Sequence, residues 1–360
     1  MQINSSNLKT VVRRGVLSVL KGVGGFHLVA NSKWRTQRLL ILCYHGVSID
    51  DEHQWRPALY MAPALLERRL QILKQGGYFV LPLGEGLERL YRRDLPPRSV
   101  ALTFDDGGYD FYKQGYPLLK KYSLPATVYQ TTYYSDHQMP IFNLACSYML
   151  WKRRERRTFE GHNIGLPGQW DITSEQGRRS VVDRLLALSE EQHLTGAQKN
   201  EVARQLAHSL EFDYEEFCSR RVLHVMTPQE FAELSAAGVD IQLHTHRHRT
   251  PLNEDLFRRE IRENRERIEA AVKLRPVHFC YPSGAWVQEF QPWLEAEGVV
   301  SATTCDTGLA DSESKAMFLP RFVDTTARSE TEFESWVSGV GHFLSCRKRA
   351  RLADFARHEA

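Results

Sequence analysis

Short apolar runs alternate with amphipathic stretches along most of the chain. The length of the apolar runs predicts buried strands at 39–43, 78–81, 100–104, 126–131, 240–243, 277–281, 299–304 and 317–323. Between them, apolar residues spaced three and four apart predict helices over 63–75, 112–122, 228–237 and 254–273. Regular alternation of strands with helices is typical of a parallel α/β architecture.

Residues 140–225 interrupt this alternation. The segment contains the basic stretch WKRRERR at 151–157 and long runs of Arg, Glu, Gln and Leu, but no apolar strand run. We therefore expect a helical insertion within one large domain that spans residues 39–345. The remaining residues, 346–360, form a basic tail for which the sequence predicts a helix.

The first 38 residues predict a basic amphipathic segment. A helix over 8–21 would place on one face Leu8, Val11, Val12, Val16, Val19 and Leu20. Lys9, Arg13, Arg14 and Lys21 would lie opposite, and Leu17 alone violates the pattern. Lys21 ends the apolar run too early for a signal peptide, so we expect these residues in the mature protein. The helix would either pack on the domain or lie on an anionic membrane surface.

Composition is that of a globular protein, with 360 residues, 42% apolar and 25% charged. A net charge of +3 is too small to indicate nucleic-acid binding. Six scattered cysteines without a CxxC pair favour a reducing compartment, so we expect a cytoplasmic protein, associated with the inner face of the membrane if the basic helix binds it.

Two adjacent carboxylates follow one predicted strand, in the sequence Thr103-Phe104-Asp105-Asp106-Gly107. A turn at the glycine would bring both carboxylates into one pocket. Like charges that share a pocket need a cation or a proton between them. The motif therefore indicates a metal ligand beside a base, although a solvated turn has the same sequence.

Three histidines follow another predicted strand, in the sequence His244-Thr245-His246-Arg247-His248. His244 and His248 share a face if a helical turn begins at Thr245, and His244 and His246 share one if the strand continues. We favour the first geometry, because the apolar run ends at residue 243. An exposed polar loop is the alternative to both.

Two imidazoles and a carboxylate are a common ligand set for a catalytic metal that keeps a position for water. Hydrolysis needs no redox chemistry, so zinc is the expected divalent ion. Cobalt, manganese and iron are alternatives.

TFDDG followed by the HTHRH histidines resembles the polysaccharide deacetylase family, whose members share the NodB-homology domain. Other segments are similar to the family in the same order, namely LCYHGV at 42–47, LPATVYQTT at 124–132, MTPQEFAELSAAGVDIQLHTHRH at 226–248, FCYPSG at 279–284 and LPRF at 319–322. The resemblance implies a distorted (β/α) barrel of about seven strands, with the active site at the carboxyl ends of the strands.

The resemblance also implies residue roles. Asp105 would be the catalytic base, and Asp106, His244 and His248 would hold the metal. The third motif would supply the oxyanion site, through the amide of Ser283 and through Tyr281.

Two departures from the family pattern leave roles to be filled. The third motif lacks the arginine that often orients the base, and Arg321 is the candidate substitute. The late histidine that serves as general acid is absent, so His45 is the first candidate for proton donor and His246 the second. Asp306 is a candidate for a fourth-motif carboxylate, unless it and Arg321 form an ordinary surface ion pair.

From this resemblance we expect hydrolysis of N-acetyl groups on an amino-sugar glycan or on a lipid-linked glycan precursor. Removal of O-acetyl groups from a polysaccharide is one alternative. A degenerate barrel that binds carbohydrate without turnover is another.

Overall fold

The computed structural model of the protein describes residues 5–344, with side chains from residue 12 onward, so the predicted basic tail at 346–360 lies outside the described residues. Seven parallel strands close into a barrel, as predicted. In order around the barrel they are β1(Leu40–Tyr44), β12(Leu319–Val323), β11(Ser301–Thr307), β10(His278–Cys280), β9(Asp240–Leu243), β6(Thr127–Gln130) and β5(Ser99–Phe104). Pairing of β1 with both β12 and β5 closes the ring.

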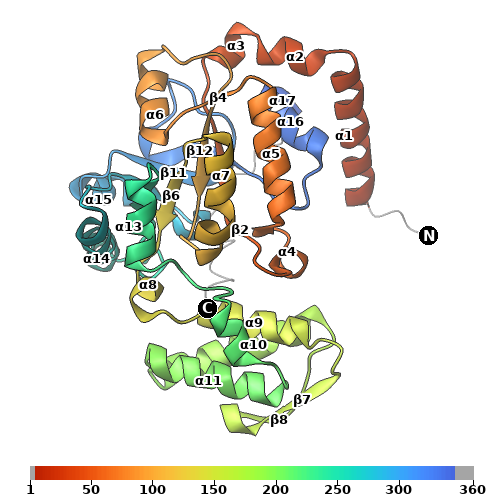
Figure 1. The fold of residues 1–360 in the computed structure, drawn as a ribbon, viewed down its shortest axis with the longest axis vertical. Helices are drawn as coiled ribbons and strands as arrows, with labels where there is room; N and C mark the ends of the chain where they lie inside the picture. Colours follow the sequence, from red (N-terminus) through yellow and green to blue (C-terminus); the bar gives the residue numbers. More distant parts are fainter. Residues whose placement is uncertain (1–4, 345–360) are drawn as a thin grey trace.

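Helices cover the outside of this barrel (Figure 1). They are α5(Pro63–Gln75), α7(Tyr116–Tyr122), α13(Pro228–Ala236), α14(Glu254–Val272), α15(Phe290–Ala296) and α16(Glu330–Ser338). A further helix, α6(Leu83–Arg92), packs at the end where the strands begin, and its buried leucines join the residues of the barrel interior. The expected strand at 78–81 exists as β4(Phe79–Val80), but it lies outside the ring. It pairs with the first residues of β5, whereas β6 pairs with the last ones.

Alternation along the strands divides the core into two layers. Leu40, Leu42, Val100 and Leu102 belong to a large apolar cluster that includes residues of the covering helices. The intervening positions, such as Ile41 and Ala101, form a second cluster with Tyr129, Cys280 and Leu319 from other strands, in the barrel interior. Because side chains alternate, the interior series continues from Ala101 through Thr103 to Asp105. The barrel pattern therefore directs Asp105 inward.

Residues 140–225 form a lobe at the end of the barrel where the strands terminate (Figure 1). It has its own buried apolar cluster, and its elements are α9(Phe142–Lys152), β7(Thr158–Gly161), β8(Leu166–Asp171), α10(Glu175–Glu191), α11(Gly196–Ser209) and α12(Tyr214–Ser219). The β7–β8 hairpin is an addition to the purely helical insertion that we expected. Neither strand contains an apolar run, because exposed and buried residues alternate in β7 and most of β8 is exposed.

The described chain also contains short helices and strands. Beside the site lie β2(Gly46–Val47), β3(Tyr60–Met61), α4(Glu52–Trp55) and α8(Tyr133–His137), and at the two ends lie α1(Ser5–Gly22), α2(Gly25–Ala30), α3(Lys33–Thr36) and α17(Val340–Leu344). None of the helices within residues 5–344 is both long and apolar enough to cross a bilayer.

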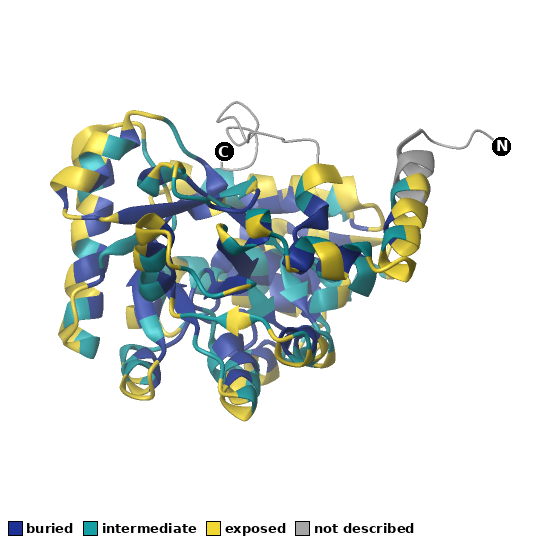
Figure 2. Ribbon diagram, turned by 90° about the horizontal axis from the view of Figure 1, so that it is seen from above, coloured by how far each residue is buried: buried dark blue, intermediate teal, exposed yellow. Residues whose placement is uncertain are grey.

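The N-terminal helix α1 packs with the opposite face from the one that the sequence suggested. Leu17, the apparent violation, is fully buried and clusters with Phe26 and Val340. On the charged side, Lys21 pairs with Glu334 of α16 and Arg14 with Glu332. Charge pairing with α16 thus turns the valine face of α1 toward solvent, where Figure 2 shows the helix largely exposed. The exposed valines are Val12, Val16 and Val19, at 57%, 43% and 65%.

Candidate active site

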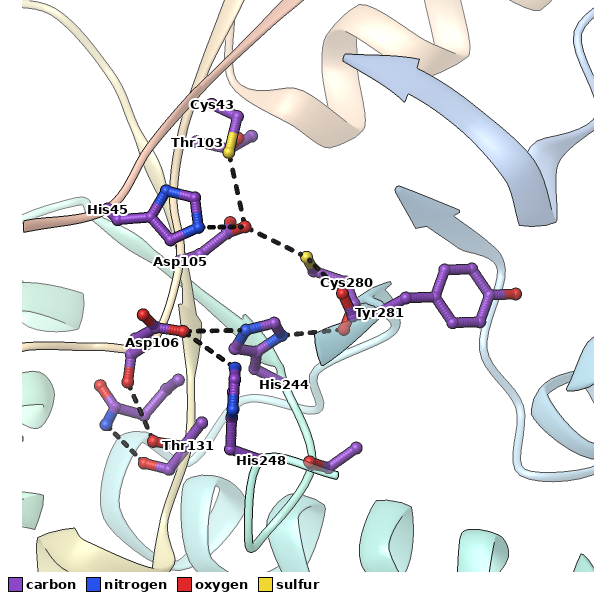
Figure 3. Close-up of polar contacts among 12 residues, drawn as sticks. Cys43, His45, Thr103, Asp105, Asp106, Thr131, His244, His248, Cys280 and Tyr281 are labelled. Carbon is purple, nitrogen blue, oxygen red and sulfur yellow. Dashed lines mark hydrogen bonds and ion pairs between the residues drawn. The ribbon is translucent and has the colours of Figure 1, made fainter. Parts of the chain in front are cut away.

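The loops after β1, β5, β9 and β10 meet at one end of the barrel (Figure 3). Asp105 and Asp106 follow β5, His45 follows β1, and the histidine loop, residues 244–249, follows β9. This is the end at which parallel α/β barrels place their active sites.

Asp106, His244 and His248 form a compact group whose ligand atoms lie within 4.8 Å of one another. The Nε2 atoms of both histidines lie 3.2 Å from Oδ1 of Asp106. The Nδ1 atom of His244 lies 2.8 Å from the carbonyl oxygen of Cys280. That bond fixes the imidazole so that Nε2 faces the group, an arrangement typical of metal-binding histidines.

Electrostatics keep this group ready to hold a cation. Burial would raise the pKa of the Asp106 carboxyl, but hydrogen bonds from His244 and His248 outweigh it and hold the pKa well below its usual range. Two imidazole nitrogens and one carboxylate oxygen, with part of the Asp106 side chain open to solvent, fit a divalent ion with room for water.

The histidine loop reaches this geometry by a route that the sequence did not suggest. No helical turn begins at Thr245. Instead Thr245 and His248 adopt left-handed backbone conformations, with φ of 60° and 56°. Asp106 and Ser283 are also left-handed, at 71° and 55°. Such conformations cost free energy in residues other than glycine, and they concentrate at functional sites.

His246 is turned away from the group, against the HxH alternative. Its Nδ1 atom lies 2.8 Å from Oγ1 of Thr132, and its Nε2 atom lies 3.9 Å from Glu263. Among residues 5–344 it belongs to none of the clusters that could hold a metal.

Asp105 is buried beside Arg321, which reaches it from β12. Two hydrogen bonds of 2.7 Å join Nη1 and Nη2 of the guanidinium to the two carboxylate oxygens. Burial would raise the pKa of Asp105, but the charge and hydrogen bonds of Arg321 hold it far below its usual range. Arg321 is itself fully buried, so it does not form a surface ion pair with Asp306.

Two thiols complete the surroundings of Asp105. The Sγ atoms of Cys43 and Cys280 each lie 3.4 Å from its Oδ2 atom. Burial raises the pKa of both thiols, so they remain neutral donors. Arg321 and the thiols together fix the position and the charge of this carboxylate.

Of the other residues predicted for the site, His45 lies near Asp105, whereas the Tyr281 side chain does not face the cluster. Nε2 of His45 lies 3.9 Å from Oδ2 of Asp105, and the ring is partly exposed. Ser283 is exposed in the loop after β10. The Tyr281 side chain points away from the cluster (Figure 3), because its hydroxyl donates to the carbonyl of Met317 inside the core. Tyr281 can therefore contribute only backbone atoms to the site.

A small cavity beside the two aspartates contains residues that sequence reasoning missed. His45, Asp105 and Asp106 line it together with Asp110 and His224. Burial, followed by the charge of Glu52, raises the pKa of Asp110 to about 8, and burial lowers the pKa of His224 to about 4. The sequence DDGGYD gave one signal, since a third carboxylate follows Asp106 by four residues.

A family model described as polysaccharide deacetylase matches residues 92–300, more than half of the chain. The chain belongs to this family. The matched region contains Asp105, Asp106, His244 and His248, whereas His45 and Arg321 lie outside it.

Individual relatives are distant from this deacetylase-family chain. It is 33% identical to YxkH of Bacillus subtilis strain 168 over 93 residues, which are 26% of this chain and 31% of YxkH. It is 27% identical to the poly-beta-1,6-N-acetyl-D-glucosamine N-deacetylase of Escherichia coli K12 over 101 residues, 28% of this chain and 15% of that protein. The alignments thus span under a third of each relative.

Solved structures are similar over most of the chain. The deacetylase PplD of Streptococcus pyogenes, in complex with acetate, has a TM-score of 0.56 at 19% identity, covering 84% of this chain and 98% of PplD. The polysaccharide deacetylase BC0361 of Bacillus cereus has a TM-score of 0.51 at 14% identity, covering 84% and 69%. At such identities the likeness shows the fold alone.

Proposed function

We propose that this chain is a metal-dependent hydrolase that removes N-acetyl groups from an amino-sugar glycan or a lipid-linked glycan precursor. The observation that carries the proposal is the group of Asp106, His244 and His248 beside the buried carboxylate of Asp105. Membership of the deacetylase family and a distant relative named as a poly-N-acetylglucosamine N-deacetylase support the same reaction.

Asp106, His244 and His248 would hold the divalent ion, for which we propose zinc, with cobalt, manganese and iron as alternatives. When bound there, such an ion supplies Lewis acidity, which activates water and polarises a carbonyl. The hydrogen bond of His244 to the Cys280 carbonyl holds one imidazole in the orientation that this role requires.

Asp105 would accept the proton of the attacking water. Its paired bonds to Arg321 keep it ionised and fixed in direction, as a base must be. The same pairing lowers the basicity of Asp105, and an ion held by Asp106, His244 and His248 would offset that loss by making the water more acidic. Arg321, although it comes from β12, would thus orient the base. The backbone amide of Ser283, in the loop after β10, would donate to the developing oxyanion.

An amine leaves readily only when it is protonated, so the reaction needs a proton donor. We propose His45, because its Nε2 atom lies 3.9 Å from Asp105 and its ring lines the same cavity. His224 also lines the cavity, but a pKa of about 4 leaves it neutral at neutral pH. His246 is turned away toward Thr132.

Replacing His45 with Ala tests this role. Turnover of an N-acetyl substrate should fall by roughly 10²–10⁴-fold, with metal content unchanged. An activated acetyl ester should be affected much less, because its leaving group needs no proton. Equal losses on both substrates would remove His45 from the acid role.

The reaction itself is tested by mass spectrometry of acetylated glycans incubated with the zinc-loaded protein. We expect loss of acetyl groups from N-acetylglucosamine oligomers, and no loss with an Asp105→Asn variant that retains its metal. Release from O-acetylated polysaccharides alone would instead indicate an O-deacetylase. Binding without release from either class would indicate a non-catalytic carbohydrate-binding barrel.

For location we propose a cytoplasmic protein that contacts an anionic membrane through α1. The exposed valines Val12, Val16 and Val19 could enter the headgroup boundary. Such a contact would bring the active site to lipid-linked precursors.

A further inference from the structure

A second cavity, of about 270 Å³, lies between the lobe and the histidine loop. Lys199 of α11 and Tyr214 of α12 line it on the lobe side. Tyr133 of α8, Arg247 and Arg249 line it on the barrel side. Its volume is near the lower end for small-molecule sites, roughly 300 Å³.

This cavity is positively charged. Its lining includes three cationic side chains but no carboxylate among the residues that the structure describes. Lys199 forms no ion pair with any carboxylate in residues 5–344. Glu260 and Glu263, which pair with the arginines from outside the lining, offset two of the three charges. One positive charge therefore remains uncompensated.

Hydrogen bonds to Glu260 restrict the motion of the two arginine side chains. The buried carboxylate of Glu260 accepts from Nη1 of Arg247 at 3.0 Å and from Nε of Arg249 at 2.8 Å. Each guanidinium has five N–H groups, so these bonds orient the side chain and leave donors for a ligand. Fixed donors lose less conformational entropy on binding an anion than mobile ones do.

Residues that line this cavity are sequence neighbours of residues at the proposed metal group and at the cavity beside Asp105. Arg247 and Arg249 flank His248 directly in sequence. On the other side, Pro140 lines this cavity while its neighbour Ile141 lines the cavity beside Asp105. Tyr133 and Tyr214 add aromatic surface of the kind that amphipathic ligands such as sugars use.

We propose that this cavity is a subsite for an acidic group, a phosphate or a carboxylate, on the glycan that is deacetylated. Lys199 supplies the uncompensated charge, Arg247 and Arg249 supply oriented hydrogen bonds, and the tyrosines contact the adjoining sugar ring. The proposal deepens the proposed function, since it assigns the substrate to acidic glycans such as sugar phosphates or uronates.

Binding by the full-length, zinc-loaded protein tests the subsite independently of turnover. Thermophoresis would compare N-acetylglucosamine, N-acetylglucosamine 1-phosphate and glucuronic acid. We expect at least one acidic probe to bind more tightly than the neutral sugar. In the Lys199→Ala variant the affinity for that acidic probe should fall by roughly tenfold, the contribution of one charge-assisted hydrogen bond. The acidic probe should then bind no more tightly than the neutral sugar. The probe that responds distinguishes phosphate from carboxylate.

Two further variants sharpen the test. Lys74, at the exposed end of α5, is the matched control, and Lys74→Ala should leave all three affinities unchanged. Gly196→Phe should block the cavity, because a Cβ atom there would lie 3.3 Å from the Tyr133 hydroxyl and 3.6 Å from the Met139 sulfur.

Two outcomes would overturn the subsite. One is equal affinity for the acidic and neutral probes, and the other is a Lys199→Ala variant that binds as Lys74→Ala does. Coordination of a phosphate to zinc alone would also survive Lys199→Ala and would count against it. Acid-dependent binding by a protein that releases no acetate would contradict the proposed function and leave the subsite standing.

Discussion

The pairing of Asp105 with Arg321 should have a large and measurable effect on stability. Both side chains are almost completely buried, at 3% and 0% exposure, and two 2.7 Å bonds join them. Replacing Arg321 with Met removes the cation and leaves the carboxylate in the barrel with two thiol donors and, among residues 5–344, no other hydrogen-bonded cation. Removing one partner of a buried ion pair costs about 3–5 kcal/mol, because the other charge is stranded.

The chain offers a matched control. Arg68 of α5 also makes two bonds to one carboxylate, at 2.8 Å to each oxygen of Glu330, but these side chains are 45% and 39% exposed. Water replaces the lost partner there, so Arg68→Met should lower stability far less than Arg321→Met. Since geometry is similar at the two sites, the difference isolates the effect of burial.

The free energy of unfolding would be measured by urea denaturation in the presence of a chelator, so that metal binding does not contribute. A double variant, Asp105→Asn with Arg321→Met, should recover much of the loss, because no charge remains stranded. In Arg321→Met alone, burial should raise the pKa of Asp105 above its unfolded value. The variant should then lose stability as pH rises through that pKa. A loss in Arg321→Met no larger than in Arg68→Met would refute this reasoning.

Three further expectations concern the metal, pH and the membrane. His248→Ala should lose bound metal and activity, measured by metal analysis and acetate release, whereas His246→Ala should retain its metal; the reverse result would restore the HxH geometry. Asp110 has a pKa of about 8 in the folded protein, above its ordinary value, so the protonated form stabilises the fold and that contribution is lost as pH rises through 8. Asp110→Asn should therefore gain stability relative to the unmodified chain between pH 6 and 9 in urea denaturation, and a pH-independent difference would contradict the shift. Val16→Asp should weaken co-sedimentation with anionic vesicles, and Val300→Asp, at a 54% exposed valine elsewhere, should not; equal binding by the two variants would argue against contact through α1.

The sequence was sufficient for the barrel because its strands are buried on both sides. Each therefore reads as a continuous apolar run, and β5 is buried at every position. The sequence also predicted that the candidate residues Asp106, His244 and His248 lie close together, and the structure brings them together. Their motif lies where a strand ends, and the carboxyl ends of parallel strands share one end of the barrel.

What the sequence could not supply depended on partners far away in the chain. The orientation of α1 depends on Glu332 and Glu334 of α16, which lie more than 300 residues later. The turn of the histidine loop depends on left-handed backbone at Thr245 and His248, residue types that seldom adopt it. His224 enters the site only because the lobe folds back onto the end of the barrel.

Arg321 places a cation beside Asp105 from a strand other than the one that precedes the third motif. Its strand, β12, is separated from β5 in the ring only by β1, and the Arg321 guanidinium reaches the Asp105 carboxylate across that distance. Cys280 lies in the strand of the third motif, the segment in which the resemblance led us to expect an arginine. The small cysteine side chain leaves room for the Arg321 guanidinium, whose Nη2 atom lies 3.1 Å from Sγ of Cys280. The Asp105 carboxylate needs a fixed cation beside it, but any strand with a nearby interior position can supply that cation. A missing motif residue is therefore weak grounds for calling a barrel inactive when another interior position can supply the same charge.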